Sequence, residues 1–380
     1  MAKLGDVCSI ISGSTPNTNM PEYWDGDIKW ITPAELNEDS FYVMDSVRHI
    51  TEQGKNKAGL TYMPAGTVIL SSRAPIGKTA IAGCEMCCNQ GFKNLICSDS
   101  VYNEYLYFFL KGKTDYLNSL GRGATFKELS KSIVENIDIP LPNYETQKQI
   151  AHQFRKIELV IKLRKQQLSK LDELVKSRFV ELFGDFIETE NPVDFESICE
   201  FVTVGIANSA THAFCDDGVI MFRNQNIKED YLDTSDIVHI TSEFASKYKT
   251  KMLKKDDLLI VRTGYPGVAC LVPEQYEGCQ TFTTLIARLK DTDTINPRFV
   301  CHYINSEYGK KYVKDNSAGA AQQNFGATAL SKLPICIPPI ELQNEYISFI
   351  EQTDKSKLKI QKSLEKLETL KKALMQKYFG

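Results

Sequence analysis

Long hydrophobic runs are missing from this 380-residue chain, and its start is not hydrophobic either. No apolar stretch approaches the roughly 18 residues of a membrane span. The opening MAKLGDVCSI lacks the basic segment and apolar core of a secretory signal. The eleven cysteines are irregularly spaced and odd in number, which is typical of reduced thiols rather than of a disulfide framework. We therefore expect a cytoplasmic protein without membrane contact.

The motifs of common enzyme sites are also scarce. No glycine-rich loop is followed by Lys and then Ser or Thr, and the triplet Gly121-Arg122-Gly123 is too short for a nucleotide loop and follows a predicted helix. Cys84, Cys87 and Cys88 have no Cys/His pair at the spacing that would complete a zinc site. The sequence predicts a non-catalytic chain with no metal or cofactor of its own. An enzyme with a divergent site remains the alternative that these absences disfavour.

The net charge of −3 is unevenly distributed. Between Glu145 and Phe183 there are nine Lys/Arg and five Asp/Glu, and between Glu341 and Phe379 there are eight and six. The rest of the chain has 28 basic and 37 acidic residues, so it is acidic. Because a basic stripe can lie on an acidic protein, the overall charge neither predicts nor excludes binding to nucleic acid.

An internal duplication spans most of the chain. GTVILSSRAPIGKTAIAG, from residue 66, matches DLLIVRTGYPGVACLVP, from residue 257, with Gly77 opposite Gly267. QGFKNLI (90–96) falls opposite QTFTTLI (280–286), and SKLDELVKSRFVELFG (169–184) falls opposite EKLETLKKALMQKYFG (365–380). The repeated unit is far longer than a solenoid repeat, so it is a domain with its helix, copied in tandem. Two similar but unequal copies suit a target with two unlike halves.

Each copy is predicted to be an α+β domain. Short β-rich segments bounded by glycine and proline predict strands at 68–70, 80–82 and 92–96, and again at 258–261, 269–272 and 281–287. Pro266-Gly267 predicts a type II turn, because glycine tolerates the positive φ that this turn requires. One mixed aromatic helix is expected in each copy, from Tyr105 to Leu120 and from Phe299 to Val313.

A proline segment ends each domain and a long helix follows it. Ile139-Pro140-Leu141-Pro142 and Ile337-Pro338-Pro339 permit a helix only after them. Steps of four and three then give a heptad seam of about 40 residues in each helix. The seam positions are Ile150, Phe154, Ile157, Ile161, Arg164, Leu168, Leu171, Val175, Arg178 and Leu182, and Tyr346, Ile350, Thr353, Lys357, Ile360, Leu364, Leu367, Lys371, Leu374 and Tyr378. A single apolar stripe needs a partner, and we expect the two helices to pair as an antiparallel coiled coil.

The predicted organisation therefore has five parts. A first domain covers residues 1–142, a helix 143–184, an acidic linker 185–194, a second domain 195–338 and a last helix 339–380. Gly184 is expected to cap the first helix.

The order of these parts resembles the specificity subunits of type I restriction–modification systems. The motif I-x-I-P-L-P-x-x-E-x-Q-x-x-I (137–150), the helix ending KSRFVELFGD, the second domain and the second proline-plus-helix element follow that family's plan. STPNTNMPEYWDGDIKWITPAEL (14–36) is similar to the start of one of its target recognition domains. The resemblance covers essentially the whole chain. One departure is Cys336-Ile337-Pro338-Pro339-Ile340, which is a residue or two out of step with the first proline segment.

The resemblance implies a function that the residue patterns alone do not show. Specificity subunits form and break no covalent bond. Each recognition domain reads one half of a bipartite target in double-stranded DNA, and the two helices set the spacing. The helices also dock two adenine methyltransferase subunits, which bring S-adenosylmethionine, and ATP-dependent restriction subunits can join. The Asn/Asp-Pro-Pro-aromatic motif of adenine methyltransferases is absent from this chain, whose Pro338-Pro339 starts a helix instead.

Polar residues in turns next to strands are the candidates for DNA contact. Arginine pairs bidentately with guanine, Asn or Gln pairs with adenine, and lysine neutralises phosphate. The candidates are Arg73, Lys78, Lys93, Asn94, Arg122 and Lys127 in the first copy, and Arg223, Asn224, Gln225, Arg262, Tyr265, Gln322, Gln323 and Asn324 in the second. Any one of them could equally be a solvated loop residue. Matched positions carry different residues (Arg73/Thr263, Lys93/Thr283, Lys127/Thr328 or nearby), as two different reading surfaces or neutral drift would both produce.

Two further alternatives stay open. The seam charges Arg164, Arg178, Lys357 and Lys371 either extend to water from the helix edge or select the register of the pairing. The acidic charge and the lack of a dense basic patch also permit a coiled-coil scaffold whose duplicated domains bind protein.

Overall fold

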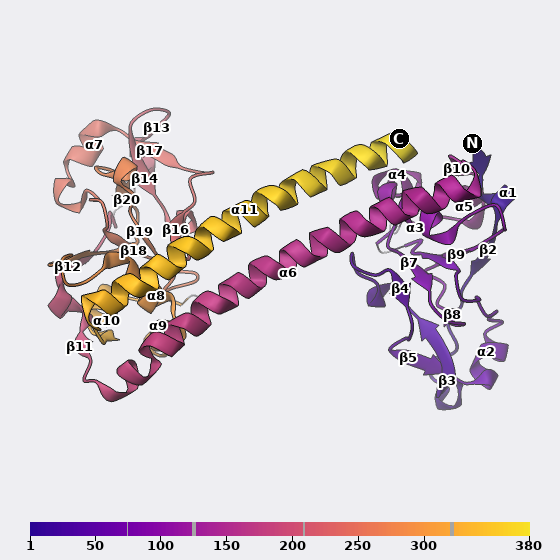
Figure 1. Cartoon of the computed structure of the whole chain (residues 1–380), viewed down its shortest axis with the longest axis horizontal. Helices are drawn as coiled ribbons and strands as arrows, with labels where there is room; N and C mark the ends of the chain where they lie inside the picture. Colours follow the sequence, from indigo (N-terminus) through magenta and orange to yellow (C-terminus); the bar gives the residue numbers. More distant parts are fainter. Residues whose placement is uncertain (74, 124–126, 208–209, 320–322) are drawn as a thin grey trace. The chain divides into compact units, whose positions relative to one another are not determined.

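The computed structural model describes residues 1–73, 75–123, 127–207, 210–319 and 323–380. It divides into two compact units, and each unit combines an α+β domain with one segment of each long helix (Figure 1). Unit 1 is Met1–Gln166 with Gln361–Gly380, and unit 2 is Gln167–Ile360. The predicted class, two tandem α+β domains with two long helices, is confirmed. The units divide both helices, whereas the sequence placed the domain ends at residues 142 and 338.

Unit 1 contains two mixed sheets. The larger has the strand order β2-β9-β6-β7-β4 and the smaller has the order β5-β3-β8, while β1 pairs with β10. The strands are β1 Ala2–Lys3, β2 Cys8–Ser12, β3 Trp24–Ile31, β4 Tyr42–Val43, β5 Arg48–Ile50, β6 Val68–Leu70, β7 Thr79–Ala82, β8 Cys87–Cys88, β9 Lys93–Cys97 and β10 Asp138–Ile139. The helices are α1 Leu4–Val7, α2 Glu52–Lys57, α3 Asn103–Gly112, α4 Thr114–Leu120 and α5 Lys131–Glu135, with short 3-10 turns η1 Pro21–Tyr23 and η2 Pro33–Glu35.

Unit 2 is built on two four-stranded sheets. Their strand orders are β12-β21-β18-β19 and β13-β17-β14-β20, and two short pairs, β15-β16 and β11-β22, accompany them. The strands are β11 Val193–Asp194, β12 Cys199–Val204, β13 Phe214–Cys215, β14 Val219–Phe222, β15 Ile227–Lys228, β16 Tyr231–Leu232, β17 Val238–Ile240, β18 Leu258–Ile260, β19 Ala269–Leu271, β20 Gln280–Thr281, β21 Leu285–Leu289 and β22 Pro334–Ile335. The helices are α7 Ser242–Ser246, α8 Pro297–Asn305, α9 Glu307–Asp315 and α10 Ala327–Ser331, with 3-10 turns η3 Phe195–Ile198, η4 Thr211–Ala213, η5 Asn224–Asn226, η6 Lys249–Lys251 and η7 Glu274–Tyr276.

The predicted strands are present, with two corrections to the elements around them. The expected strand 281–287 is two strands, β20 and β21, because Thr283 between them adopts a positive φ of 58°. Each expected aromatic helix is also two helices, α3 with α4 and α8 with α9. The turn prediction at Gly267 is supported by its φ of +90°, and Gly77 in the matching hairpin has +96°.

The glutamine of each proline-plus-helix motif fastens the long helix to its own domain. Gln147 is fully buried; its Oε1 accepts from the Tyr102 N–H (2.9 Å) and its Nε2 donates to the carbonyls of Ser100 and Pro142 (both 2.9 Å). Gln343 repeats the arrangement in unit 2, where its Oε1 accepts from the backbone of Asn296 at 2.8 Å. The motif therefore satisfies buried backbone groups at the junction of helix and domain.

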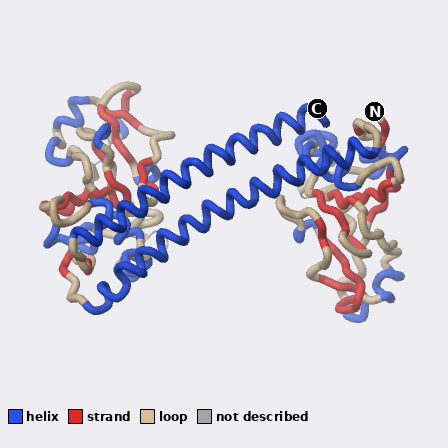
Figure 2. The backbone as a smooth tube through the Cα atoms, in the orientation of Figure 1, coloured by secondary structure: helices blue, strands red, loops and turns tan. Residues whose placement is uncertain are grey.

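The two long helices lie side by side and antiparallel within each unit (Figure 2). Helix α6 runs Tyr144–Thr189 and α11 runs Ile340–Phe379. In unit 1, Phe154 of α6 stacks on Phe379 of α11 with ring centroids 5.7 Å apart. In unit 2, Phe179 meets Tyr346 at 5.5 Å. All twenty predicted seam positions are buried or half-buried, so the heptad prediction is confirmed.

The prediction that Gly184 caps the first helix is wrong, because α6 continues to Thr189. Phe183 is fully buried in the unit 2 core and Ile187 packs against that core. Their burial stabilises the additional helical turn, and the acidic linker begins correspondingly later. Within the described residues, no helix is both long enough and apolar enough to cross a membrane.

The seam charges at positions 178, 357 and 371 each meet an acidic residue on the opposite helix. Arg178 donates to Glu345 (2.7 Å), Lys371 donates to Glu158 (2.6 Å), and Lys357 lies 2.5 Å from Asp172. Each of these pairs forms in one antiparallel alignment only. This geometry favours register selection over simple extension to water.

Candidate nucleic-acid interface

Three of the predicted cations of unit 1 come together around Glu128. The Glu128 backbone bridges both Arg73 and Arg122, with the Arg122 N–H donating to the Glu128 carbonyl at 3.1 Å. The Lys93 Nζ lies 3.2 Å from the Glu128 Oε1. These four residues come from the turn after β6, from β9 and from the loop between α4 and α5. Glu128 thus contacts Arg73 and Arg122 through its backbone and Lys93 through its carboxylate.

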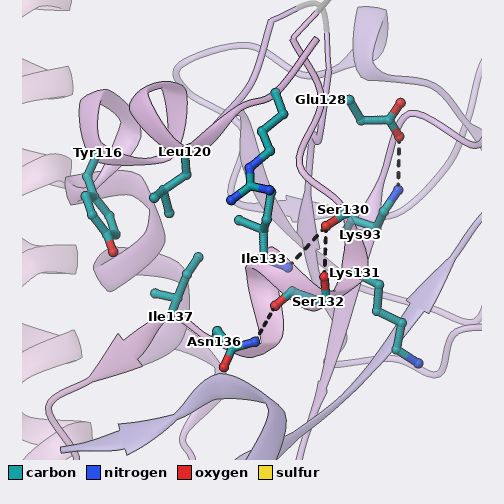
Figure 3. Close-up of a pocket in the computed structure, with 11 residues that line it drawn as sticks. Lys93, Tyr116, Leu120, Glu128, Ser130, Lys131, Ser132, Ile133, Asn136 and Ile137 are labelled. Atoms are coloured by element: carbon teal, nitrogen blue, oxygen red, sulfur yellow. Dashed lines mark hydrogen bonds and ion pairs between the residues drawn. The ribbon is translucent and has the colours of Figure 1, made fainter.

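A cavity of about 760 Å³ opens beside this cluster (Figure 3). Its cationic lining is Lys93, Arg122 and Lys131, and Glu128 is its one carboxylate. Figure 3 shows Ser130, Ser132 and Asn136 along α5, where Ser130 caps the helix by accepting from the Ile133 N–H (3.2 Å). The apolar side of the cavity is formed by Tyr116, Leu120, Ile133 and Ile137. Three cations with one acid, flanked by hydroxyl and amide donors, suit a phosphate-bearing ligand.

Asn94 does not belong to this surface. It is fully buried, and its Nδ2 contacts the Cys88 Sγ at 2.8 Å. Side chains alternate between the faces of a strand, so Lys93 at the start of β9 turns toward Glu128 while Asn94 turns into the core. The prediction of Asn94 as a DNA contact conflicts with this burial. Lys78 is half-buried and donates to the Pro33 carbonyl at 3.0 Å, whereas Lys127 is exposed.

The predicted residues of unit 2 also form one cluster, from three segments. The Asn224 Nδ2 donates to the Thr263 Oγ1 (2.9 Å), and the hydroxyl of Tyr265 donates to the Asn224 carbonyl (2.8 Å). The Arg262 Nε donates to the Asn324 Oδ1 at 3.1 Å. The cluster therefore joins η5, the turn after β18 and the loop before α10.

Asp236 organises the other side of the unit 2 cluster. Its carboxylate lies 3.0 Å from the Arg223 Nη2 and accepts from the Gln225 Nε2 at 2.6 Å. Gln323 is exposed, and its carbonyl accepts from the Gly264 N–H at 3.4 Å. Gln322 lies outside the described residues. Glu128 and Asp236 were not predicted from the sequence, because the search was for donors that contact DNA and not for the acids that pair with those donors. Both acids lie close in sequence to predicted residues, and this proximity was the available signal.

The two clusters occupy equivalent places in the duplicated fold. The Leu129 N–H donates to the Ser72 carbonyl in unit 1, and the Phe325 N–H donates to the Arg262 carbonyl in unit 2, both at 2.9 Å. Glu128 bridges Arg73 and Arg122, while Asn324 bridges Thr263 and Ala318. Arg73 and Thr263 are therefore equivalent, as the sequence match indicated, and so are Arg122 and Ala318, and Glu128 and Asn324.

Two of the sequence-matched pairs need correction. The equivalence of Glu128 with Asn324 places Lys127 opposite Gln323 rather than Thr328. On the sheet, Val68 pairs with Leu95 whereas its counterpart Leu258 pairs with Ala287. This register places Lys93 opposite Leu285 rather than Thr283, because the offset between the copies grows by two residues between these strands.

Eight of the eleven cysteines are buried, and His302 is the buried one of the five described histidines. Burial raises the pKa of Cys87 to about 11 and that of Cys88 to about 12. The described part of the chain holds no group of three His, Cys, Asp or Glu residues with the geometry of a metal site. The polar clusters are thus made of donors and acceptors rather than of nucleophiles or metal ligands.

Comparison with known proteins gives a consistent family. The family profile described as type I restriction modification DNA specificity domain matches residues 1–173 and again 191–372. The chain is similar to the type I restriction enzyme MjaIX specificity subunit of Methanocaldococcus jannaschii, with 28% identity covering 99% of this chain and 91% of that protein.

Solved structures share the fold. A type I restriction–modification S subunit from M. genitalium superimposes with a TM-score of 0.57 at 13% identity, covering 100% of this chain and 95% of that one. A second structure, from work on complex assembly and conformational transition of a type I system, gives a TM-score of 0.63 at 15% identity, with 100% and 96% coverage. The family profile matches two segments that together cover most of the chain. The chain therefore belongs to the family of type I restriction modification DNA specificity domains.

Proposed function

We propose that this chain is the DNA-reading specificity subunit of a type I restriction–modification enzyme, and that each unit reads one half of a bipartite target. The chain itself is non-catalytic. The coiled-coil scaffold that binds only protein has no observation in its favour once the family is known.

The observation that carries the proposal is the pair of equivalent clusters with different chemistry. Unit 1 has Arg73 and Arg122 at the two backbone positions that bridge Glu128, and unit 2 has Thr263 and Ala318 at the two that bridge Asn324. Equivalent backbone positions with unlike donors and acceptors are what two readers of different half-sites require, since base edges differ in their donor and acceptor pattern. The cationic cavity of unit 1 would accompany base reading with phosphate contact.

The helices would supply spacing and docking. Their antiparallel seam is continuous in each unit, with ion pairs such as Lys371–Glu158 fixing the register. We assign to them the spacing of the half-sites and the binding of two methyltransferase subunits. Those subunits would bring S-adenosylmethionine, and ATP-dependent restriction subunits would complete the cytoplasmic enzyme.

Mapping of methylated adenines tests the proposal. Cells carrying this chain with its methyltransferase subunits are compared with cells lacking the chain, and a chimera carries the first domain (residues 1–142) of a relative. We expect a bipartite motif that depends on the chain, with one half replaced in the chimera and the other retained. A motif that is unaffected by loss of the chain, or a chimera that changes both halves, would contradict it.

A further inference from the structure

We propose that Arg262 reads a guanine in the half-site recognised by unit 2, and that Asn324 positions it for this contact. The inference rests on the proposed function and names one base of the target. It follows from how Arg262 is held and from the groups that surround it.

The backbone of Arg262 is fixed by the loop before α10. Its carbonyl accepts from the Phe325 N–H at 2.9 Å, directly after the buried residue Val261 that follows β18. Asn324, whose Oδ1 receives the Arg262 Nε, is braced in turn by two backbone hydrogen bonds with Ala318 (2.8 and 3.0 Å). The guanidinium is therefore oriented by a side chain that is itself held in place. Such preorganisation lowers the entropy cost of binding a ligand.

The terminal nitrogens of Arg262 face no carboxylate among the described residues. Other arginines of unit 2 are neutralised: Arg223 lies 3.0 Å from Asp236, Arg288 lies 2.7 Å from Asp257, and Arg298 lies 2.5 Å from Asp354. The hydrogen bond from Arg262 to Asn324 is exposed, so the remaining donors of the guanidinium are accessible to a ligand. Arg262 itself is half-buried.

The surroundings favour a base over a phosphate. Arg262 hydrogen-bonds to the neutral Asn324, and its chain neighbour Thr263 bonds to the neutral Asn224, which accepts from Tyr265. The charged pair of the cluster, Arg223 and Asp236, lies on its other side and is self-neutralised. Phosphate sites gather several cations, as the unit 1 cavity does with Lys93, Arg122 and Lys131. With Nε bound to Asn324, Arg262 retains two terminal NH₂ groups. These match the O6 and N7 acceptors of guanine in the major groove, which arginine reads bidentately.

Unit 1 lacks this reader. The position equivalent to Arg262 is Ser72, which is fully buried, and the position equivalent to Asn324 is Glu128, which engages Lys93. The contact made by Arg262 therefore belongs to the half-site of unit 2. That half is identified experimentally as the one that persists when residues 1–142 are exchanged.

The test measures base preference with the assembled methyltransferase complex. The complex modifies a DNA library randomised at each target position in turn, and the modified adenines are sequenced. Arg262→Lys keeps the charge but loses the planar fork, so preference for one G·C pair in the unit 2 half should fall roughly 5- to 150-fold with other positions unchanged. Arg262→Gln should shift the preference at that pair toward A·T, because glutamine pairs with adenine.

The positioning role of Asn324 has its own comparison. Asn324→Ala should weaken the preference at the same base pair but by less than Arg262→Lys. Asn324→Asp should not restore it, because the new carboxylate would pair with the guanidinium as Asp236 pairs with Arg223. Arg298→Lys, at an arginine that pairs with Asp354 outside the cluster, serves as the matched control and should leave the preference at that base pair unaltered. Thermal unfolding of each complex verifies that the variants fold.

Each other outcome overturns the inference. An Arg262→Lys complex with unchanged preference excludes base reading, and a uniform loss over all sequences assigns Arg262 to phosphate. A change in the unit 1 half contradicts the placement. If the unaltered complex shows no bipartite preference, the proposed function itself fails, and this is seen before any variant is tested.

Discussion

Replacing Gln147 by alanine should destabilise unit 1 by about 3 kcal/mol. The side chain is fully buried and makes three hydrogen bonds, one accepted from the Tyr102 N–H and two donated to the carbonyls of Ser100 and Pro142. The variant leaves a buried N–H and two carbonyls unsatisfied. Each hydrogen bond contributes roughly 0.5–1.5 kcal/mol, and a buried orphan donor costs about 1–3 kcal/mol.

Scanning calorimetry of the full chain measures this loss. For a unit of about 190 residues, 1 kcal/mol corresponds to about 2–4 °C, so we expect the melting of unit 1 to fall by roughly 6–12 °C. Gln147→Glu should also destabilise, because a carboxylate cannot donate to the two carbonyls. The matched control is Glu145→Ala, at an exposed position of the same motif, which should change stability by less than about 0.5 kcal/mol. If Gln147→Ala melts within about 1 kcal/mol of this control, the glutamine does not fasten the helix to the domain.

The remaining predictions concern the helices and one buried histidine. Lys357→Glu should cost roughly 1 kcal/mol by opposing Asp172, and adding Asp172→Lys should recover most of it in thermal unfolding; additive losses would mean that the pair does not select the register. Inserting one heptad after Leu168 and one after Leu364 preserves the seam and adds about 10 Å to the pair. The gap in the methylated motif should then grow by roughly three base pairs at about 3.4 Å each, and an unchanged gap with retained activity would refute the spacer role. Burial, partly offset by the Asp230 carboxylate 3.6 Å away, lowers the pKa of His302 below 6.5. The unfolded chain therefore binds a proton at His302 more readily than the folded chain does, and protonation favours unfolding. The stability that the folded chain keeps while His302 is neutral is present above pH 6.5 and is lost as the pH falls below it. His302→Gln should show a shallower decline of melting temperature between pH 7 and 5, whereas identical slopes would exclude His302 as the source.

Periodic features were predictable because their evidence is local. The seam from Ile150 to Leu182 depends on spacing within one helix, and the positive φ of Gly267 depends on a dipeptide. Both were read correctly from the sequence. The α+β class and the duplication follow from the same kind of pattern.

Features decided by a partner strand were not predictable in this way. Asn94 and Lys93 are adjacent buried polar residues, and only the pairing of β9 with β2 and β6 decides which of them faces Glu128 and which faces the core. Gly184 is a helix-ending residue by propensity, but the burial of Phe183 outweighs that preference. Strand β3 and the acids Glu128 and Asp236 were likewise missed, since their roles depend on contacts with other segments of the chain.

The partition of unit 1 into two distant segments affects how the protein is made. Its core includes Phe379, which stacks on Phe154 and contacts Tyr105 and Phe109. The ribosome must add Gln167–Ile360, the whole of unit 2, before this residue exists. At roughly 5–20 residues per second the aromatic face of the first domain waits about 10–40 s for its cover. Translation speed and chaperone access during that interval are therefore part of the folding of unit 1.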